Sequence, residues 1–226
     1  MNLVILAAGY GTRINENSEI PKGLIKIKDK SIIETNIENI NDVINISKLI
    51  LITNKKYFNL YDDFLNIFDI KYEILINNSI ERGNGYSFFL AKQGVNTDEF
   101  ILIMSDHVFS KSFIRSAILG RGLAVDSDPI YVDYDDATKV LTDSKGRIKK
   151  IGKKLKNYNF IDTGFFILNK NIFSYSDEIE LLHDKFGVSD IIRKAKINII
   201  DVTKNTWVDI DTKKDLKVAK ELFTIS

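Results

Sequence analysis

The chain has 226 residues, a length that suits a single α/β domain with a substantial core. Its 32 basic and 31 acidic side chains are interspersed, so the sequence lacks the electrostatic footprint of a nucleic-acid-binding protein. Cysteine is absent, which excludes disulfides, thiolate metal sites and cysteine nucleophiles. No apolar stretch reaches the roughly 20 residues that cross a bilayer, and no leader precedes the first apolar run. We therefore expect a cytoplasmic protein without direct membrane insertion.

The opening stretch carries the strongest functional signal. The apolar run Leu3–Leu6 predicts a buried parallel strand, and a glycine-containing turn, Ala7–Arg13, follows it. Such a turn lets backbone N–H groups point inward toward phosphate, and Arg13 and Lys22 would add positive charge. The turn lacks the third glycine of a dinucleotide fingerprint and the Gly-Lys-Ser/Thr of a P-loop. We predict a triphosphate site in this turn, and the nucleotide-binding residues expected here are Leu6, Ala7, Ala8, Gly9, Gly11, Thr12, Arg13 and Lys22.

Beyond this turn, hydrophobic periodicity predicts alternating helices and strands. A polar loop over residues 14–20 is expected to cover the phosphates, and Ser31 is a candidate N-cap for a helix over Ile32–Ile44. Strands are predicted over Leu24–Ile27, Leu49–Ile52, Tyr72–Ile76 and Phe100–Met104, and helices over Tyr57–Phe68 and Phe88–Lys92.

A second glycine-containing loop, Arg82–Ser87, precedes the predicted helix at Phe88. Its backbone amides and the Asn84 side chain could contact the edge of a base, because the loop would lie at the carboxyl edge of the sheet, where open α/β sheets bind ligands. The alternative is an ordinary strand-to-helix turn. The residues predicted to bind nucleotide here are Arg82, Gly83, Asn84, Gly85 and Ser87.

Acidic residues follow two predicted strands. Asp106 comes directly after the buried run Phe100–Met104, where it could hold a divalent cation or cap a following helix. Asp209 and Asp211 alternate after Trp207, so in an extended segment they share a face and could address the same metal centre. Either could instead belong to the start of the terminal helix. His107 could contact substrate or make a supporting hydrogen bond.

From Leu123 onward, short strand-like runs and turns replace the alternating pattern. These runs cover residues 130–134, 137–141, 146–152 and 160–168. We expect this half to bind the acceptor, through the ammonium group of Lys139 and the backbone and hydroxyl of Thr163 and Gly164. The charge run Lys149–Lys156 is typical of a solvated face, although Lys149 or Lys150 could reach a substrate phosphate.

These motifs together resemble a known family. The combination L-A-A-G-x-G-T-R followed by Pro21-Lys22 resembles the nucleotidyltransferases that join an NTP to a phosphorylated small molecule. Five further runs make the chain similar, from Leu3 to Leu222, to the CTP:inositol-1-phosphate cytidylyltransferases: Pro21-Lys22-Gly23-Leu24, Arg82-Gly83-Asn84-Gly85-Tyr86-Ser87, Met104-Ser105-Asp106-His107-Val108, Ala137-Thr138-Lys139-Val140 and Asp162-Thr163-Gly164-Phe165-Phe166. Ser105 stands where that family often has glycine.

The resemblance implies a Rossmann-like α/β nucleotidyltransferase fold, with a mainly parallel central sheet flanked by helices and an added β-rich acceptor-binding subregion. We expect one domain over residues 1–226. Within it, residues 1–122 would bind nucleotide, residues 123–205 the acceptor, and residues 206–226 would supply metal-binding acids and a terminal helix.

The resemblance also implies an activity: transfer of a cytidylyl group from CTP to inositol-1-phosphate. Mg²⁺ would be held by Asp106 with Asp209 or Asp211, and Arg13 and Lys22 would be catalytic. In the family this enzyme is often fused to a membrane-embedded synthase. The resemblance of this sequence covers only the cytidylyltransferase part, so we expect its product to supply a separate membrane synthase of the CDP-alcohol phosphatidyltransferase type. A homodimer is compatible with the resemblance.

Three alternatives remain open. A phosphocholine cytidylyltransferase or sugar-1-phosphate nucleotidyltransferase would keep the same mechanism, and a choline group would call for an aromatic cage. An inactive nucleotide-binding regulator would not need both halves of a metal site. A nucleotide-sugar glycosyltransferase predicts a D-x-D motif, but the chain has Asp106-His107-Val108. The four rings that could form a cage are Tyr131, Tyr134, Phe165 and Phe166.

Overall fold

The computed structural model describes residues 1–14 and 19–223, so the centre of the predicted polar loop over residues 14–20 lies outside the described residues. Four parallel strands form the heart of the sheet in the order β5-β4-β1-β6. Their carboxyl ends are level, because Leu6 of β1 lies opposite both Ile52 of β4 and Met104 of β6. These strands are β1 (Asn2–Leu6), β4 (Lys48–Thr53), β5 (Tyr72–Ile76) and β6 (Glu99–Met104).

Antiparallel strands extend the sheet beyond β6. The long strand β11 (Phe160–Asn169) pairs with β6 along one edge and with β8 (Gly122–Asp126) along the other, and its first residues extend past β6 to pair with β9 (Lys139–Thr142). β10 (Ile148–Gly152) pairs with β9, and β12 (Ile199–Asp201) runs parallel to β8. The described residues thus make one nine-stranded sheet with a parallel half and a largely antiparallel half.

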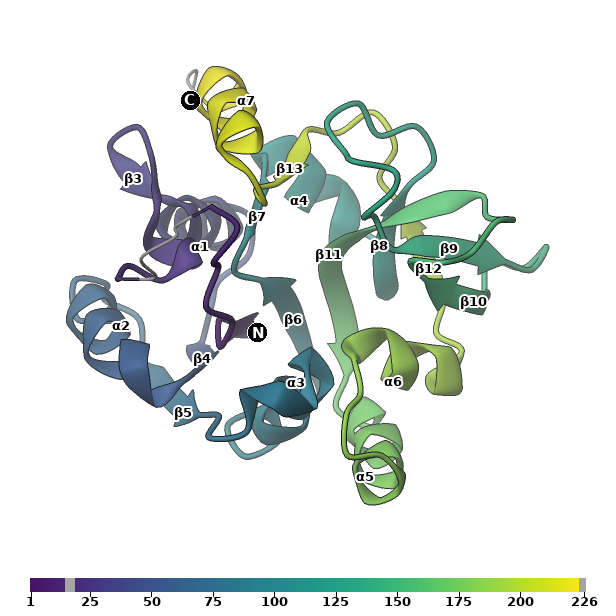
Figure 1. The fold of residues 1–226 in the computed structure, drawn as a ribbon, viewed down its shortest axis with the longest axis horizontal. Helices are drawn as coiled ribbons and strands as arrows, with labels where there is room; N and C mark the ends of the chain where they lie inside the picture. Colours follow the sequence, from purple (N-terminus) through teal and green to yellow (C-terminus); the bar gives the residue numbers. More distant parts are fainter. Residues whose placement is uncertain (15–18, 224–226) are drawn as a thin grey trace.

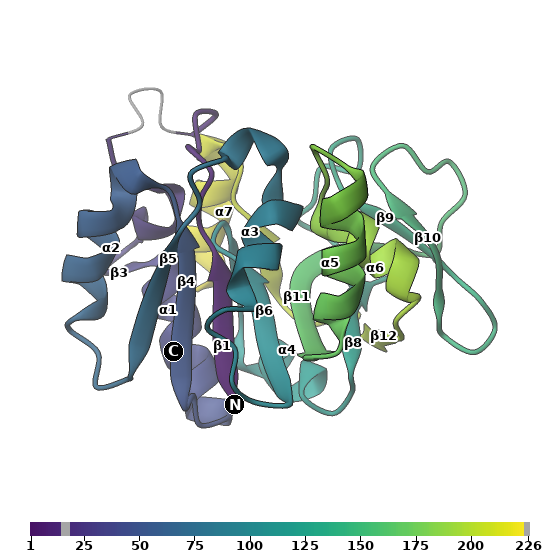
Figure 2. The same cartoon turned by 90° about the horizontal axis from the view of Figure 1, so that it is seen from below.

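Helices cover both faces of the sheet (Figures 1 and 2). The alternation of side chains along β1 explains why, since Leu3 and Ile5 belong to one hydrophobic core and Val4 and Leu6 to the other. The helices of the first face are α1 (Ile32–Val43), α2 (Phe58–Leu65) and α4 (Lys111–Ala117), and those of the second are α3 (Asn84–Ala91), α5 (Ile172–Leu182) and α6 (Val188–Ala195). Among the described residues, every helix is too short or too polar to traverse a bilayer.

A third, smaller core lies beside α1. The terminal helix α7 (Lys213–Leu222) packs there against two small ribbons, one formed by β7 (His107–Phe109) with β13 (Trp207–Asp209) and one by β2 (Lys26–Ile27) with β3 (Lys30–Ser31). Single turns of 3-10 helix cover Lys22–Leu24, Lys55–Tyr57 and Ile80–Arg82. The β7–β13 ribbon matters for function, because it places Asp209 opposite His107.

Most predicted elements are confirmed, including the Ser31 cap, which forms a reciprocal capping box with Glu34. The helix predicted over Tyr57–Phe68 is shorter, and the one predicted from Phe88 begins at Asn84. Residue Asp106 caps no helix, since β7 follows it and Ser110 caps α4.

Residues 130–134 are not a strand, which corrects the prediction. The Asp133 side chain accepts the backbone N–H of Asp135, and the Asp133 carbonyl accepts that of Ala137. These local hydrogen bonds use backbone groups that a strand would need for pairing, so they hold the segment in turns. The strand β8, in contrast, was missed by the periodicity argument.

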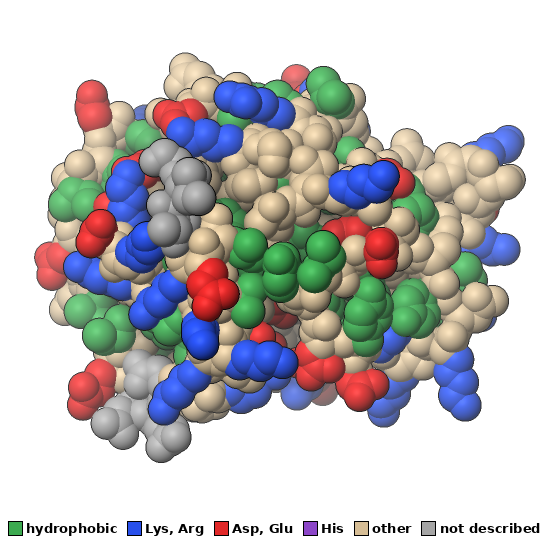
Figure 3. All heavy atoms as spheres, turned by 90° about the horizontal axis from the view of Figure 1, so that it is seen from above, with side chains coloured by type: hydrophobic (Ala, Val, Ile, Leu, Met, Phe, Trp, Pro, Cys, Tyr) green, Lys and Arg blue, Asp and Glu red, His purple; other side chains and the backbone are tan. Residues whose placement is uncertain are grey.

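Figure 3 shows the face that carries α7 at the top of Figure 1. Basic and acidic side chains intermingle on it, with hydrophobic side chains between them. The interspersed charge expected from the composition is therefore seen on this face of the folded protein.

Candidate active site

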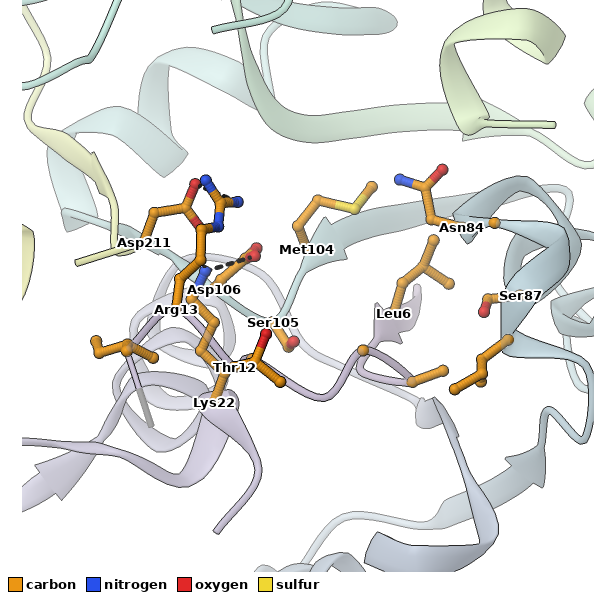
Figure 4. A pocket seen from close by; sticks show the side chains of 16 residues that line it. Leu6, Thr12, Arg13, Lys22, Asn84, Ser87, Met104, Ser105, Asp106 and Asp211 are labelled. Carbon is orange, nitrogen blue, oxygen red and sulfur yellow. Dashed lines mark hydrogen bonds and ion pairs between the residues drawn. The ribbon is translucent and has the colours of Figure 1, made fainter. Parts of the chain in front are cut away.

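A cavity of about 310 Å³ lies at the carboxyl ends of β1 and β6. Between these two strands the order of the parallel sheet reverses, which is where open α/β sheets bind ligands. The turn after β1, the 3-10 turn at Lys22, the start of α3 and the end of β6 line it (Figure 4). The predicted triphosphate turn therefore borders a real cavity.

One end of this cavity is highly charged (Figure 4). The Lys22 ammonium is 3.0 Å from Asp106 Oδ2 and also pairs with Asp211, whose second oxygen is 2.8 Å from Arg13 Nη2. Burial by itself lowers the pKa of Lys22, but the charge of Asp106 and the hydrogen bond to Asp211 outweigh it and raise that pKa. Lys22 is thus a positively charged group at neutral pH at this end of the cavity.

The other end of the cavity is uncharged. Leu6, Ile80, Gly83, Asn84 and Ser87 line it, and Figure 4 shows Asn84 and Ser87 across the cavity from the charged cluster. The charged and uncharged ends of the cavity thus match the two ends of a nucleotide, which has charged phosphates at one end and an uncharged base at the other.

Asp106, His107 and Asp209 form a group in which one ligand atom of each lies within 4.8 Å of the others. The β7–β13 pairing creates it by setting Asp209 opposite His107. Asp209 Oδ1 is buried and has no hydrogen-bond partner among the described residues, which fits a site that takes a cation. Asp211, in contrast, is not a member of the group and faces Lys22 and Arg13.

Burial and mutual interaction shift the pKa values of this group. Burial raises the pKa of Asp209 to about 6, whereas the charge of Lys22 and the hydrogen bond from His107 overcome burial and hold the pKa of Asp106 well below its usual range. Burial lowers the pKa of His107, but the Asp209 charge and the Asp106 bond at 2.9 Å raise it to about 9. Without a cation, His107 is protonated at neutral pH.

These pKa values predict a pH-dependent stability of the metal-free protein. Because the pKa of His107 is raised from 6.5 to about 9, its protonation favours the folded state. This contribution is complete below pH 6.5 and is lost as the pH rises toward 9. In the presence of EDTA, we expect the free energy of unfolding measured with urea to fall across this window. The variant His107→Asn should lose most of that slope, while His183→Asn, which changes the other histidine, should keep it.

A second cavity, of about 220 Å³, adjoins the first and shares Arg13, Asn84, Met104, Asp106 and Asp211 with it. Its walls come from the antiparallel half of the sheet, the β7–β13 ribbon and the start of α6. Polar groups there include Asp162, whose pKa burial raises to about 6, and Asp136, which bridges Arg13 and Lys153 at 2.7 and 2.6 Å.

The structure brings most predicted site residues together around the two cavities. The first is lined by Leu6, Ala8, Gly9, Gly11, Thr12, Arg13, Lys22, Gly83, Asn84, Ser87 and Asp106, and the second by His107, Gly164, Asp209 and Asp211 as well. Gly164 has a φ of +73°, and a Cβ there would lie 3.0 Å from the His107 ring, so glycine permits this close approach.

Several predicted residues lie outside the cavity walls. The Lys139 ammonium donates to the Lys153 carbonyl at 3.0 Å, and the Thr163 hydroxyl donates to the Ala124 carbonyl at 2.8 Å. Arg82 stacks over the Tyr86 ring and pairs with Glu180 at 2.9 Å. Lys149, Ala7 and Gly85 also do not line either cavity. A Cβ at Gly85 would lie 2.4 Å from Phe186, so this glycine serves chain packing.

Two features were not anticipated. Lys153 lines the second cavity, although it belongs to the charge run that was assigned to a solvated face, and Asp136 had no sequence signal at all. The proposed aromatic cage does not form, because Phe165 and Phe166 belong to cores on opposite faces of β11.

Comparison with known proteins shows the family to which the chain belongs. Residues 2–224 match the family described as nucleotidyl transferase, and the chain belongs to this family. It is 39% identical over 97% of its length to the bifunctional IPC transferase and DIPP synthase of Thermococcus kodakarensis, and 36% identical over 96% to the protein of the same name from Aquifex aeolicus. The chain spans 50% of each of these relatives.

Solved structures extend the likeness. The inositol-1-phosphate CTP transferase from T. maritima superimposes with a TM-score of 0.87 and 26% identity, covering 97% of this chain and 93% of that one. The glucose-1-phosphate thymidylyltransferase from Bacillus anthracis, at 19% identity and a TM-score of 0.82, shares the fold. The predicted nucleotidyltransferase fold is confirmed.

Proposed function

We propose that the protein transfers a cytidylyl group from CTP to inositol-1-phosphate in a Mg²⁺-dependent reaction that yields CDP-inositol and pyrophosphate. The main support is that the two cavities share Asp106, Asp211 and Arg13, and that Lys22 pairs with both of these carboxylates. A nucleotide cavity and an acceptor cavity that share cationic and carboxylate groups suit the joining of two phosphates. The names of the relatives support the choice of CTP and inositol phosphate.

The nucleotide would lie along the first cavity. Its phosphates would bind the backbone N–H groups of the turn Gly9–Thr12 and the side chains of Arg13 and Lys22, and its base would lie between Asn84 and Ser87. Lys22 is placed to neutralise charge that develops on the phosphoryl oxygens. Arg13 is more exposed and would exchange its partner Asp136 for phosphate.

Asp106 and Asp209, with His107 beside them, would hold the divalent cation through their carboxylate oxygens. When bound, such a cation neutralises phosphate charge and orients the reacting groups. Asp211 would hold Lys22 and Arg13 in position from the opposite side.

The acceptor would bind in the second cavity with its phosphate toward Lys153 and Arg13. An acceptor phosphate oxygen then attacks the α-phosphorus of CTP in line, the bond to the β-phosphate oxygen breaks, and pyrophosphate leaves. The acceptor is already an anion at neutral pH, so no protein nucleophile is required. The protein contributes alignment and charge neutralisation.

A lysine pair tests the acceptor site. We expect Lys153→Ala to raise the KM for inositol-1-phosphate at least tenfold, about the loss of one charge-assisted hydrogen bond, with little change in the KM for CTP. Lys149→Ala removes a neighbouring exposed lysine outside the cavity and should leave both constants unchanged. Steady-state kinetics with one substrate varied at a time measures both. Equal effects of the two variants would refute this placement of the acceptor.

The function itself is tested by pyrophosphate release with Mg²⁺ across four NTPs and three acceptors, inositol-1-phosphate, glucose-1-phosphate and phosphocholine. Release confined to CTP with inositol-1-phosphate supports the proposal. Turnover with another pair would retain the nucleotidyl transferase family and discard these substrates. Absence of turnover in every combination would favour a regulatory role.

We further propose that residues 1–122 bind nucleotide and residues 123–205 the acceptor, with the acids of residues 206–226 between them. The relatives' names pair an IPC transferase with a DIPP synthase. By analogy, the product would be used by a synthase, whether in the same chain or in a separate membrane protein.

A further inference from the structure

The Asn84 side chain is held in one orientation by a helix from the other half of the protein. Its Oδ1 accepts the backbone N–H of Val188, the first residue of α6, at 3.0 Å. A backbone N–H can only donate, so the oxygen of the amide must face α6 and the NH₂ group must face away. Nδ2 has no partner in the part of the chain that the structure describes, and in Figure 4 it points toward Met104 and the cavity.

Ser87 is less constrained. Its Oγ accepts from Asn77 Nδ2 at 2.9 Å, and the orientation of Asn77 is itself set by the Ser79 N–H, which donates to Asn77 Oδ1 at 2.7 Å. The Ser87 hydroxyl keeps its O–H donor and one acceptor lone pair, so it can pair with either kind of group on a base. Thus the group with a fixed character at the uncharged end is the NH₂ of Asn84, which can only donate.

A fixed donor that faces N3 discriminates between the pyrimidines. Cytosine presents an acceptor at N3, whereas uracil carries a hydrogen on N3 and presents a donor there. The Asn84 NH₂ facing the uracil N3–H would leave both groups unpaired in a partly desolvated site, which costs more than the loss of a hydrogen bond alone. The same NH₂ group would donate to cytosine N3 without rearrangement.

We propose that Asn84, oriented by the first backbone amide of α6, selects cytosine over uracil by donating to N3 of the base. This inference rests on the proposed function only in that the first cavity binds a pyrimidine nucleotide, and it does not depend on the acceptor. It also means that base choice is set partly by α6, whose Val188 and Ser189 line the acceptor cavity.

Asn84→Asp reverses the pattern offered to the base. One carboxylate oxygen can still accept the Val188 N–H, and the other presents an acceptor where the amide presented a donor. We expect the ratio of the dissociation constants for UTP and CTP to fall at least tenfold, the scale of one mismatched buried hydrogen bond. Isothermal titration with each nucleotide, in Mg²⁺ and without acceptor, measures the ratio. The added negative charge weakens both nucleotides, and its effect cancels in the ratio.

Val188→Pro removes the hydrogen bond without changing Asn84. Proline is tolerated at the first position of a helix, and the preceding Gly187 has the extended conformation (φ −108°, ψ 166°) that proline requires. The matched control is Val188→Ala, which shortens the same buried side chain but keeps the N–H. We expect Val188→Pro to lower the UTP/CTP ratio several-fold and Val188→Ala to retain the wild-type value.

The outcomes separate this inference from the proposed function. Tighter CTP binding by the wild type with an unchanged ratio in Asn84→Asp would overturn the role of Asn84 and leave the cytidylyltransferase intact. Equal or tighter binding of UTP by the wild type would overturn the inference, and binding of neither nucleotide would overturn both. If Val188→Pro does not fold, as judged by circular dichroism, the Asn84→Asp ratio decides. Pyrophosphate release with a different acceptor would change the proposed function while leaving this inference standing.

Discussion

Lys22→Ala is expected to lower turnover at least 10²-fold, the scale lost when one major electrostatic donor is removed from an active site. The Lys22 ammonium is buried between Asp106 and Asp211, whereas Arg13, the other cation of the cluster, contacts only Asp211 of these two. The raised pKa of Lys22 keeps it protonated at neutral pH. Single-turnover measurement of pyrophosphate release at saturating substrates isolates this loss from changes in binding.

The control for Lys22 is Lys26→Ala, which removes an exposed lysine on β2 only four positions along the chain. It should turn over like the wild type. Because Lys22→Ala leaves two carboxylates facing each other, its fold is checked by circular dichroism and by its urea transition. A folded Lys22→Ala protein with wild-type turnover would remove Lys22 from the mechanism.

Asp209→Asn is expected to weaken Mn²⁺ or Mg²⁺ binding at least tenfold and to reduce turnover accordingly. Asp209 contributes a buried oxygen without a hydrogen-bond partner among the described residues to the group with Asp106 and His107, and the variant replaces a charged ligand by a neutral amide. Asp211→Asn removes a carboxylate two residues away that is already paired with Lys22 and Arg13. It should therefore change metal affinity much less.

This pair of variants is measured by titration of Mn²⁺ followed by electron paramagnetic resonance, in the absence of nucleotide. That measurement does not require turnover, so its result does not depend on whether CTP and inositol-1-phosphate are the correct substrates. A larger loss of Mn²⁺ affinity in Asp211→Asn than in Asp209→Asn would show that Asp211 is the main ligand.

The features predicted correctly from the sequence depend on neighbours in the chain. The apolar run Leu3–Leu6, the Ser31 N-cap and the glycine turn before Arg13 are each marked by residues within a short stretch, so their sequence pattern identifies them. The clustering of Asp106 with the opening turn was also predictable, because parallel strands align their carboxyl ends at one edge of a sheet.

The relation between Asp209 and Asp211 required the tertiary structure. An extended segment would have placed both carboxylates on one face, but β13 ends at Asp209, and beyond it the chain turns toward the Thr212 cap of α7. Asp209 consequently joins His107 across the β7–β13 ribbon, and Asp211 joins Lys22 and Arg13. Strand ends depend on partners distant in sequence, which local spacing does not reveal.

The region around the second cavity also combines features that the sequence predicts with features that only the tertiary structure decides. Local pattern identified a lysine-rich, β-forming region, and it ranked Lys139 and Lys149 above Lys153. Which lysine lines the cavity is decided by the course of the chain after β10, where Lys153 meets Asp136 from an irregular loop. Short-range propensity thus determined most strands and helices and the turn after β1, whereas the pairing of remote side chains was decided by tertiary packing, because those contacts exist only once the sheet has assembled.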